Sequence, residues 1–374
     1  MIMTTLAQSA IHNPRIGMRV MIAGGGTGGH IYIGVALARE VKRRDSSSEF
    51  LFVGTRRGLE SRIVPREGFR LEFIDSAGLK GVGLTRAVRS ALLMPQGIVQ
   101  SGRLVRDFAP DVVIGLGGYS SGPVLLASWL RRKPTLIVEP NAYPGLTNRW
   151  LALLVDRAVL ALPDRGGHFR GKGVVTGIPV RPEFGSLPVR EHRSGSLTLL
   201  VYGGSQGSHA LNTVVCAALE ELKKMSPALR IIHQTGEREL EPVQRAYQEA
   251  RVEADVRAFL PRIYEEFAAA DLLLSRAGAG TIAEITVAGK AAILVPFPAA
   301  TDDHQTRNAR ALEESGAARM IPEAELTPDR LAAEIRDFLH HPERLTRMEE
   351  AARRLGKPDA TGRIADLLME LARK

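Results

Sequence analysis

Met21–His30 reads Met-Ile-Ala-Gly-Gly-Gly-Thr-Gly-Gly-His, an apolar run of strand type that breaks into five glycines and ends on a histidine. A helix-like segment, 35–41, follows at once. Glycines at this point let the backbone turn tightly, so that bare N–H groups and the positive end of the helix dipole can face an anion. The stretch therefore predicts a phosphate-binding loop between a strand and a helix.

A glycine loop after a strand also begins a dinucleotide-binding fold, so an NAD or FAD site is the first alternative. That site predicts an acidic residue at the end of the next strand. The next strand-like run, 50–53, ends instead in Gly54-Thr55-Arg56-Arg57, which offers no carboxylate for a ribose diol. A turn needed only for close packing is the second alternative. His30 argues against it, because a histidine on the first helical residue faces the cleft where open α/β sheets bind ligands.

The length of 374 residues suits two domains, and 44% hydrophobic residues can fill two cores. The single cysteine, Cys216, excludes disulfide scaffolding and cysteine-rich metal sites, which favours a reducing compartment. Residues 1–17 lack a basic start and a long apolar stretch, so we expect a disordered leader and no signal peptide. No apolar stretch reaches the ~18 residues of a membrane span.

The net charge of +9 is unevenly distributed. Residues 1–177 hold 24 Lys+Arg and 12 Asp+Glu, a balance of +12, whereas 178–374 hold 26 and 29, a balance of −3. A basic half attracts polyanions or an anionic membrane leaflet. Nucleic acid is the less favoured partner, since aromatic residues make up only 5% and no nucleic-acid-binding signature is present.

Strand-length apolar runs alternate with helical periodicity from 18 to about 176, which predicts a parallel sheet. The pattern stops at 177–182 and restarts with the strand 197–202, the glycine loop 203–208 and a helix over 210–223. The same opening unit thus occurs twice. We expect a first domain at 18–177, a linker at 178–195 and a second domain at 196–374. Both domains are expected to be doubly wound α/β folds that face each other across a cleft. The last helix is expected to pack back on the first domain. The remaining expected strands are 19–23, 50–53, 71–74, 112–116, 135–138, 158–160, 230–233, 256–259, 272–275 and 291–295.

Three further stretches carry candidate chemistry. Gly115–Pro123 follows a strand and opens a helix, so it can share a diphosphate with the first loop or simply form a tight turn. Glu139–Trp150 brings polar groups that can reach sugar hydroxyls, although Asn148 can equally cap or brace a helix. In Ser275–Glu284, the amides of 279–281 can meet a phosphate and Glu284 a ribose diol, or its carboxylate can serve only the helix dipole.

Residues 302–309, Asp-Asp-His-Gln-Thr-Arg-Asn-Ala, offer amide and imidazole groups for a sugar, or form an ordinary capped helix start. The sequence has no Asp-x-Asp pair, no Gly-x-x-x-x-Gly-Lys-Ser/Thr loop and no Gly-x-Ser-x-Gly elbow. These absences disfavour serine hydrolysis and ATP-driven phosphoryl transfer. A transfer that uses no metal and no cofactor remains.

In this order the motifs resemble the MurG family of GT-B glycosyltransferases, which transfer N-acetylglucosamine from UDP-N-acetylglucosamine to lipid-linked muramyl-pentapeptide in peptidoglycan synthesis. The resemblance covers residues from about 18 to about 370. The motifs that carry it lie at 24–30, 115–122, 139–148, 177–181, 203–207, 278–284 and 303–308. Four positions depart from residues common in the family. Ile33 stands where proline is common, Pro140 where glutamine is common, Ile178 where asparagine is common, and His304 where glutamine is common.

The resemblance implies that the second domain binds the donor. It places uracil against the backbone of Leu260, the ribose on Glu284, and the diphosphate on Ser205, Ala279, Gly280 and Thr281. It puts Arg181 near the nucleotide and His304 and Gln305 on the sugar. The same donor set includes Thr27, Gly28, Gly29, Asn141 and Gln206.

The resemblance also implies that the first domain binds the undecaprenyl diphosphate acceptor. The acceptor residues are Thr27, Gly28, Gly29, Gly117, Gly118, Tyr119, Asn141 and Asn148. The implied reaction is inverting: the muramyl C4 hydroxyl attacks C1 of the donor sugar and UDP leaves. Because an imidazole has an ordinary pKa of ~6.5, His30 is the best-matched general base, and Glu139 is the alternative.

The expected location is the cytoplasmic face of the cell membrane, with peripheral association. Leu79–Arg89 and the following Leu92–Met94 mix apolar and cationic residues as a membrane-associated surface does, or form an amphipathic core helix. Three alternatives to the function stay open. They are a GT-B transferase for another lipid or UDP-sugar, a UDP-N-acetylglucosamine epimerase, and a non-catalytic nucleotide-binding module.

Overall fold

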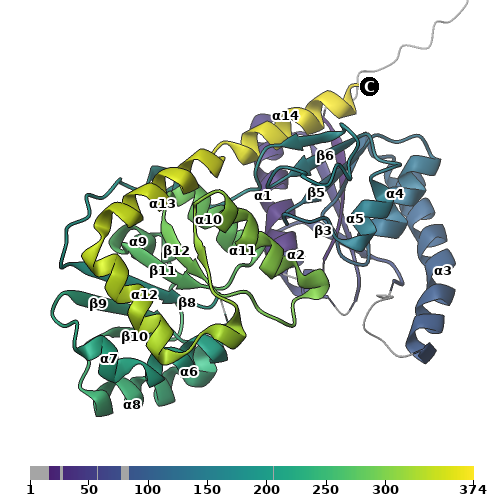
Figure 1. Ribbon diagram of the computed structural model, residues 1–374. Helices are drawn as coiled ribbons and strands as arrows, with labels where there is room; N and C mark the ends of the chain where they lie inside the picture. Colours follow the sequence, from purple (N-terminus) through teal and green to yellow (C-terminus); the bar gives the residue numbers. More distant parts are fainter. Residues whose placement is uncertain (1–16, 26–27, 57, 77–83, 205) are drawn as a thin grey trace, which may run out of the picture.

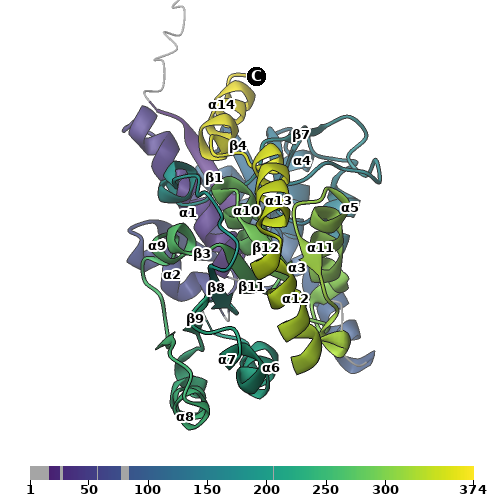
Figure 2. The same ribbon diagram turned by 60° about the vertical axis from the view of Figure 1, so that its left-hand side comes forward.

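The computed structural model describes residues 17–25, 28–56, 58–76, 84–204 and 206–374 (Figure 1). Within these residues the chain forms two parallel sheets, one of seven strands and one of six. Each sheet lies in its own lobe with helices on both faces (Figures 1 and 2). The expectation of two doubly wound α/β folds is confirmed.

The first sheet has the order β3-β2-β1-β4-β5-β6-β7, and its strands pair in parallel. The strand order reverses between the neighbours β1 and β4. At such a switch point the two following loops diverge and leave a crevice outside the carboxyl ends, where ligands bind. The strands are β1 (Arg19–Ala23), β2 (Glu49–Gly54), β3 (Arg70–Phe73), β4 (Val112–Gly115), β5 (Thr135–Glu139), β6 (Arg157–Leu160) and β7 (Gly173–Val175).

The second sheet has the order β10-β9-β8-β11-β12-β13, also parallel, with its switch point between β8 and β11. The two glycine loops predicted for this half follow these two strands. The strands are β8 (Leu197–Tyr202), β9 (Leu229–Gln234), β10 (Asp255–Arg257), β11 (Leu272–Ser275), β12 (Ala291–Leu294) and β13 (Arg319–Met320).

Two long helices, α1 and α3, and three shorter ones belong to the first domain before the second sheet begins. They are α1 (Gly28–Arg44), α2 (Glu60–Arg66), α3 (Leu84–Phe108), α4 (Ser121–Leu130) and α5 (Leu146–Leu151). The later helices are α6 (His209–Ala217), α7 (Leu219–Lys223), α8 (Leu240–Ala250), α9 (Ile263–Ala269), α10 (Ala279–Ala288), α11 (His304–Glu314), α12 (Pro328–His340), α13 (Pro342–Leu355) and α14 (Ala360–Ala372). Short 3₁₀ turns lie at η1 (Pro182–Ser186), η2 (Glu237–Glu239), η3 (Thr301–Asp303) and η4 (Glu323–Glu325).

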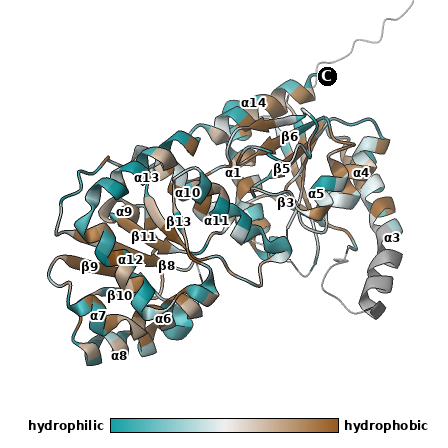
Figure 3. Cartoon of the chain, viewed as in Figure 1, coloured by the Kyte–Doolittle hydropathy of each residue, from teal (hydrophilic) through white to brown (hydrophobic). Residues whose placement is uncertain are grey.

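The central strands are apolar along their whole length because both of their faces are covered. Val112, Val113 and Ile114 of β4 are fully buried, as are Leu272, Leu273 and Leu274 of β11. Figure 3 shows this as brown strands inside helices that carry hydrophilic outer faces. Each sheet therefore has a hydrophobic core on either face and holds its loops at a fixed edge.

The last helix, α14, returns to the first domain and packs along α1 (Figures 1 and 2). Its apolar residues Ile364, Ala365 and Leu368 are fully buried in the core that contains β1 and β4. Arg44 of α1 pairs with Asp366 on the same helix. The two domains are thus joined by the segment after β7 and again by the turn before α14.

The elements differ from the sequence predictions in three places. The edge strands β7 and β13 were not predicted, because three and two residues are too few for a recognisable pattern. The helix expected over 210–223 is divided at Ala218, between α6 and α7. The first helix begins at Gly28, so His30 is its third residue and not its first.

Candidate active site

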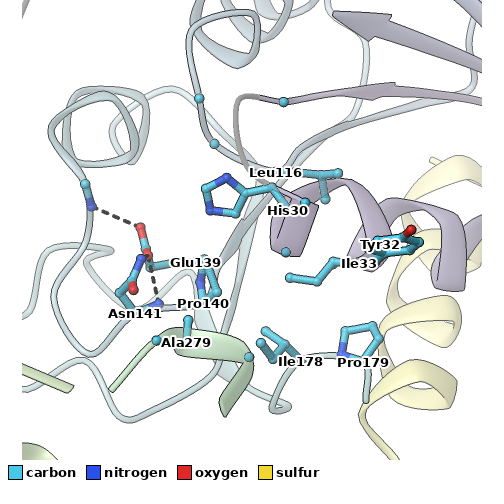
Figure 4. Close-up of a pocket in the computed structure, with 18 of the residues that line it drawn as sticks. His30, Tyr32, Ile33, Leu116, Glu139, Pro140, Asn141, Ile178, Pro179 and Ala279 are labelled. Atoms are coloured by element: carbon cyan, nitrogen blue, oxygen red, sulfur yellow. Dashed lines mark hydrogen bonds between the residues drawn. The ribbon is translucent and has the colours of Figure 1, made fainter. Parts of the chain in front are cut away.

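A cavity of about 2330 Å³ lies between the two domains. The loops at both switch points open into it, together with the segment after β5 and the start of α11. Figure 4 shows His30 and Glu139 facing this cavity from one domain, and Ala279 facing it from the other. Residues predicted from two halves of the sequence therefore share one space.

The two glycine loops of the first domain meet backbone to backbone. Gly118 has a φ of +79°, and a Cβ built on it would lie 2.5 Å from the carbonyl oxygen of Gly25. A Cβ on Gly117 would lie 3.6 Å from Cε1 of His30. Any side chain at Gly118 would push the loops apart, so the approach requires glycine. The bare backbone of the loops lines the cavity beside the imidazole.

His30 is held near the cavity wall in a mostly buried position. Burial lowers the pKa of its imidazole, and the nearby His304 of the second domain lowers it further, while the Gly25 carbonyl raises it. Its Nδ1 atom makes no well-formed hydrogen bond within the described residues. At neutral pH the ring is therefore an uncharged group that can accept a proton.

Glu139 ends β5 and is 2% exposed. One carboxylate oxygen accepts hydrogen bonds from the backbone N–H and the side-chain amide of Asn141, at 3.0 and 3.1 Å. The other accepts from the N–H of Gly145 at 3.1 Å and from Nδ2 of Asn148 at 2.8 Å. Burial raises the pKa of the carboxyl, and these four hydrogen bonds oppose the rise. The carboxylate therefore orders the loop that carries Asn141 and Asn148.

The start of α10 presents uncapped backbone to the cavity. Gly278 precedes the helix and makes no side-chain cap, and Ala279 and Gly280 line the cavity. The first N–H groups of a helix have no partner within it, and the helix dipole adds positive charge there. Thr281 does not line the cavity, whereas its neighbour Tyr202 does. This turn suits a diphosphate.

A carboxylate and a guanidinium lie one turn further along the same wall. Glu284 lies 3.9 Å from Arg181, and burial raises its pKa to about 7 while Arg181 lowers it. The Arg181 guanidinium stacks over Phe184 and Tyr264 and donates to the carbonyl of Pro261 at 3.3 Å. Leu260, the preceding residue, is buried at the cavity. Glu284 thus offers a hydrogen-bond acceptor for a ribose diol, and Leu260 offers an apolar surface for a nucleobase.

The start of α11 brings His304 and Gln305 to the cavity. Burial lowers the pKa of His304, and Asp303 raises it. Oε1 of Gln305 accepts from the N–H groups of Ala277 and Phe297, at 3.2 and 3.0 Å. Oε1 of Gln305 is therefore occupied by two backbone donors. The amide nitrogen of Gln305 is the group that can donate a hydrogen bond to a ligand.

The structure places most of the predicted site residues on this one cavity. Those that line it are Gly28, Gly29, His30, Gly117, Gly118, Tyr119, Glu139, Asn141, Asn148, Arg181, Gln206, Leu260, Ala279, Gly280, Glu284, His304 and Gln305. Thr27 and Ser205 lie outside the described residues. Of the unusual positions, Ile33 and Ile178 are buried in one hydrophobic cluster with Ala283, and Pro140 lines the cavity.

One residue at the site was not predicted as ligand-binding, and another was predicted in a different role. Gln234 ends β9, lines the cavity and has a buried Oε1 without a hydrogen-bond partner in the described part of the chain. Asn308 is buried between the domains. The sequence predicts that its amide binds a sugar, but in the structure Oδ1 and Nδ2 are occupied by Ala142, Asn141 and Ala277.

Two family models match the chain. The model described as Glycosyltransferase family 28 N-terminal domain matches residues 20–160, and the one described as Glycosyltransferase family 28 C-terminal domain matches residues 198–364. Together they cover the second sheet and all strands of the first sheet except β7.

Similar proteins include a relative from Anaeromyxobacter sp. (strain Fw109-5), 50% identical over 96% of this chain and 94% of the relative. It is named UDP-N-acetylglucosamine--N-acetylmuramyl-(pentapeptide) pyrophosphoryl-undecaprenol N-acetylglucosamine transferase. A relative from Geobacter sulfurreducens (strain ATCC 51573 / DSM 12127 / PCA) has the same name and is 42% identical over 96% of this chain and 100% of its own length.

Among solved structures, MurG from Acinetobacter baumannii matches with a TM-score of 0.78 and 30% identity, over 94% of this chain and 99% of that one. A UDP-GlcNAc 2-epimerase from Neisseria meningitidis bound to UDP-GlcNAc matches with a TM-score of 0.64 and 14% identity, over 94% and 100%. The second likeness shows the fold alone.

Proposed function

The chain belongs to the MurG family of glycosyltransferases, and from this premise we propose that it transfers N-acetylglucosamine from UDP-N-acetylglucosamine to undecaprenyl-pyrophosphoryl-N-acetylmuramyl-pentapeptide. The observation that carries the proposal is the meeting of two pairs of switch-point loops in one cavity. One pair suits the diphosphate of a sugar nucleotide and the other that of a lipid.

In the proposed reaction the C4 hydroxyl oxygen of the muramyl sugar attacks C1 of N-acetylglucosamine. The bond between C1 and the diphosphate oxygen breaks, UDP leaves, and the α-linkage becomes β. His30 accepts the hydroxyl proton. Its lowered pKa and its place on the cavity wall support this role. Glu139 is the weaker candidate because both of its oxygens are occupied by hydrogen bonds.

The donor is proposed to lie against the second domain. The uncapped start of α10 stabilises charge on the departing UDP. Glu284 holds the ribose beside Arg181, the Leu260 backbone brackets the uracil, and the start of α11 holds the sugar. The remaining proposed donor residues are Thr27, Gly28, Gly29, Asn141, Ser205, Gln206, Ala279, Gly280, Thr281, His304 and Gln305.

The acceptor is proposed to lie against the first domain, with its diphosphate on the glycine loops beside His30. The close approach of Gly118 to Gly25 presents backbone from both loops to one point. Asn141 and Asn148, ordered by Glu139, flank the muramyl sugar. The other proposed acceptor residues are Thr27, Gly28, Gly29, Gly117 and Tyr119.

The first domain is also proposed to dock on the anionic cytoplasmic face of the cell membrane. No helix in the described part of the chain is long and apolar enough to span a bilayer. The stretch 79–83 and the side chains of 84–94 lie outside the described residues. Support comes from α4 and α5: Trp129 and Leu130 are 44% and 60% exposed beside the exposed Arg131, and Trp150 is 71% exposed. Apolar and cationic groups at one surface suit peripheral binding.

The proposed function is tested by following UDP release from UDP-N-acetylglucosamine with and without a short-chain muramyl-diphosphate lipid. Release that depends on the acceptor, with a β-linked disaccharide lipid as product, is expected. Conversion of the sugar nucleotide without acceptor would instead show an epimerase. Nucleotide binding without any conversion would show a binding module.

A further inference from the structure

One buried amide bridges the two domains beside the cavity. Asn308 lies in α11 of the second domain and is 1% exposed. Its Oδ1 accepts from the backbone N–H of Ala142 at 2.8 Å, and its Nδ2 donates to Oδ1 of Asn141 at 3.2 Å. Nδ2 also donates to the carbonyl of Ala277 at 3.1 Å. Two of the three partners belong to the first domain.

Each partner continues into a part of the proposed site. Asn141 donates to Glu139 through both its N–H and its side chain. The N–H of Ala277 donates to Gln305, which lies one turn before Asn308 in α11. Ala277 also precedes Gly278 and the start of α10. The Asn308 side chain therefore connects three parts of the proposed site. They are the loop after β5, here called the acceptor-side loop, the start of α11, and the turn before α10.

The chemistry of the position demands an amide. The three partners are one donor and two acceptors, which match the carbonyl and the two N–H bonds of asparagine. Aspartate would lose both donors and place a charge against two oxygens. Alanine would leave three polar groups without partners at a buried interface. A second contact lies beside the first, since Arg307 of the same helix stacks 3.7 Å from the ring centre of Tyr143.

We propose that Asn308 is a positioning residue for the transfer reaction, which holds the two domains in the closed arrangement and sets the acceptor-side loop against the donor sugar. The inference rests on the proposed function. Asn308 does not touch the nucleotide in this scheme, so its loss affects the reacting geometry more than UDP binding.

The first test compares Asn308→Ala and Asn308→Asp with the wild type. We expect kcat to fall by about 30-fold or more, which is the scale of losing two hydrogen bonds, while the Kd of UDP from calorimetry stays within about threefold. Arg165→Ala is the matched control, because Arg165 also pairs across the domains with Glu314, but both side chains are exposed and neither lines the cavity. Its kcat is expected to stay within about twofold.

The second test measures the distance between the two domains and does not depend on enzymatic activity. Spin labels on Lys42→Cys in α1 and Glu249→Cys in α8, two exposed sites in different domains, report the interdomain distance in a Cys216→Ser background. We expect Asn308→Ala to broaden the distance distribution and Arg165→Ala to leave it unchanged. A thermal melt identifies any variant that has failed to fold. In that case Asn141→Ala, which removes one partner of Asn308 from the other domain, must give the same broadening of the distance distribution.

The inference is overturned if Asn308→Ala keeps kcat within about twofold, or if UDP affinity falls as much as kcat. A narrow, unchanged distance distribution would also overturn it. If the wild type shows no acceptor-dependent UDP release, the proposed function fails while the distance measurement still tests the bridge.

Discussion

Nη2 of Arg181 lies 3.9 Å from Oε1 of Glu284 in the donor half of the cavity. Burial raises the pKa of Glu284 to about 7 despite this partner. Since a protonated carboxyl is a poorer acceptor for a ribose diol, we expect the affinity for UDP-N-acetylglucosamine to rise by up to about tenfold from pH 6 to pH 8. This donor is suitable because its esterified diphosphate does not titrate in that range. Calorimetry over this pH range measures the change.

Glu284→Gln should abolish this pH dependence and weaken donor binding. The folded pKa of Glu284 lies above the ordinary 4.5, so the contribution of this group to stability is present below pH 4.5 and is lost as the pH rises through about 7. The glutamine variant should therefore melt at a higher temperature than the wild type at pH 8. A pH dependence that survives in the variant would assign it to another group.

His30→Ala is expected to lower kcat by about 10²–10⁴-fold, the usual contribution of a general base, with donor affinity within about threefold. Because burial lowers the pKa of His30, the acid limb of kcat/KM in the wild type should lie below pH 6.5. Lys42→Ala, an exposed change on the same helix, is the control. A variant at His30 that keeps wild-type turnover would remove the imidazole from the mechanism.

Glu139→Gln tests whether the carboxylate of Glu139 orders the loop after β5 or acts as the general base. The glutamine NH₂ would meet N–H donors that now point at the carboxylate, so we expect the free energy of unfolding to fall by about 2–3 kcal/mol together with activity. Denaturant melts and steady-state rates measure both. Loss of activity with unchanged stability would instead favour Glu139 as the base. Glu183→Gln, on the exposed turn η1, should change neither.

Gly118→Ala tests the contact between the two glycine loops. The alanine Cβ would collide with the Gly25 carbonyl at a φ of +79°, so we expect a loss of about 1–3 kcal/mol in stability and a large drop in acceptor-dependent turnover. Gly68 has a similar φ of +81° but open space around it. Gly68→Ala should therefore lose some stability and keep its turnover. Equal turnover in the two variants would refute a special role for the loop contact.

The membrane-docking proposal is tested with vesicles containing phosphatidylglycerol. Trp129→Ser with Leu130→Ser should reduce cosedimentation about tenfold or more, on the scale of burying such side chains, and high salt should weaken the binding of the wild type. Val189→Ser, an even more exposed apolar position in the linker segment, is the control. Binding to neutral vesicles that is as strong as to anionic ones would argue against an electrostatic component.

Much of the architecture was predictable because it depends on local patterns. β1, β8 and β11 occupy the predicted residues, since strands buried on both faces read as short apolar runs that end in glycines. The short edge strand β13 escaped prediction, because two residues carry no periodicity. The family, its fold and its activity class were likewise readable from the order of the motifs, and the comparisons confirm them.

The sequence by itself determined where the glycine loops, the helix starts and the candidate base lie along the chain, because each is a local consequence of residue type. Only the tertiary structure decided which of them meet. Glu139 reads as a possible base until four donors are seen around it, and Asn308 reads as a sugar ligand until its amide is found on Asn141, 167 residues away. Such pairings follow from strand order and domain packing, and no local pattern records them.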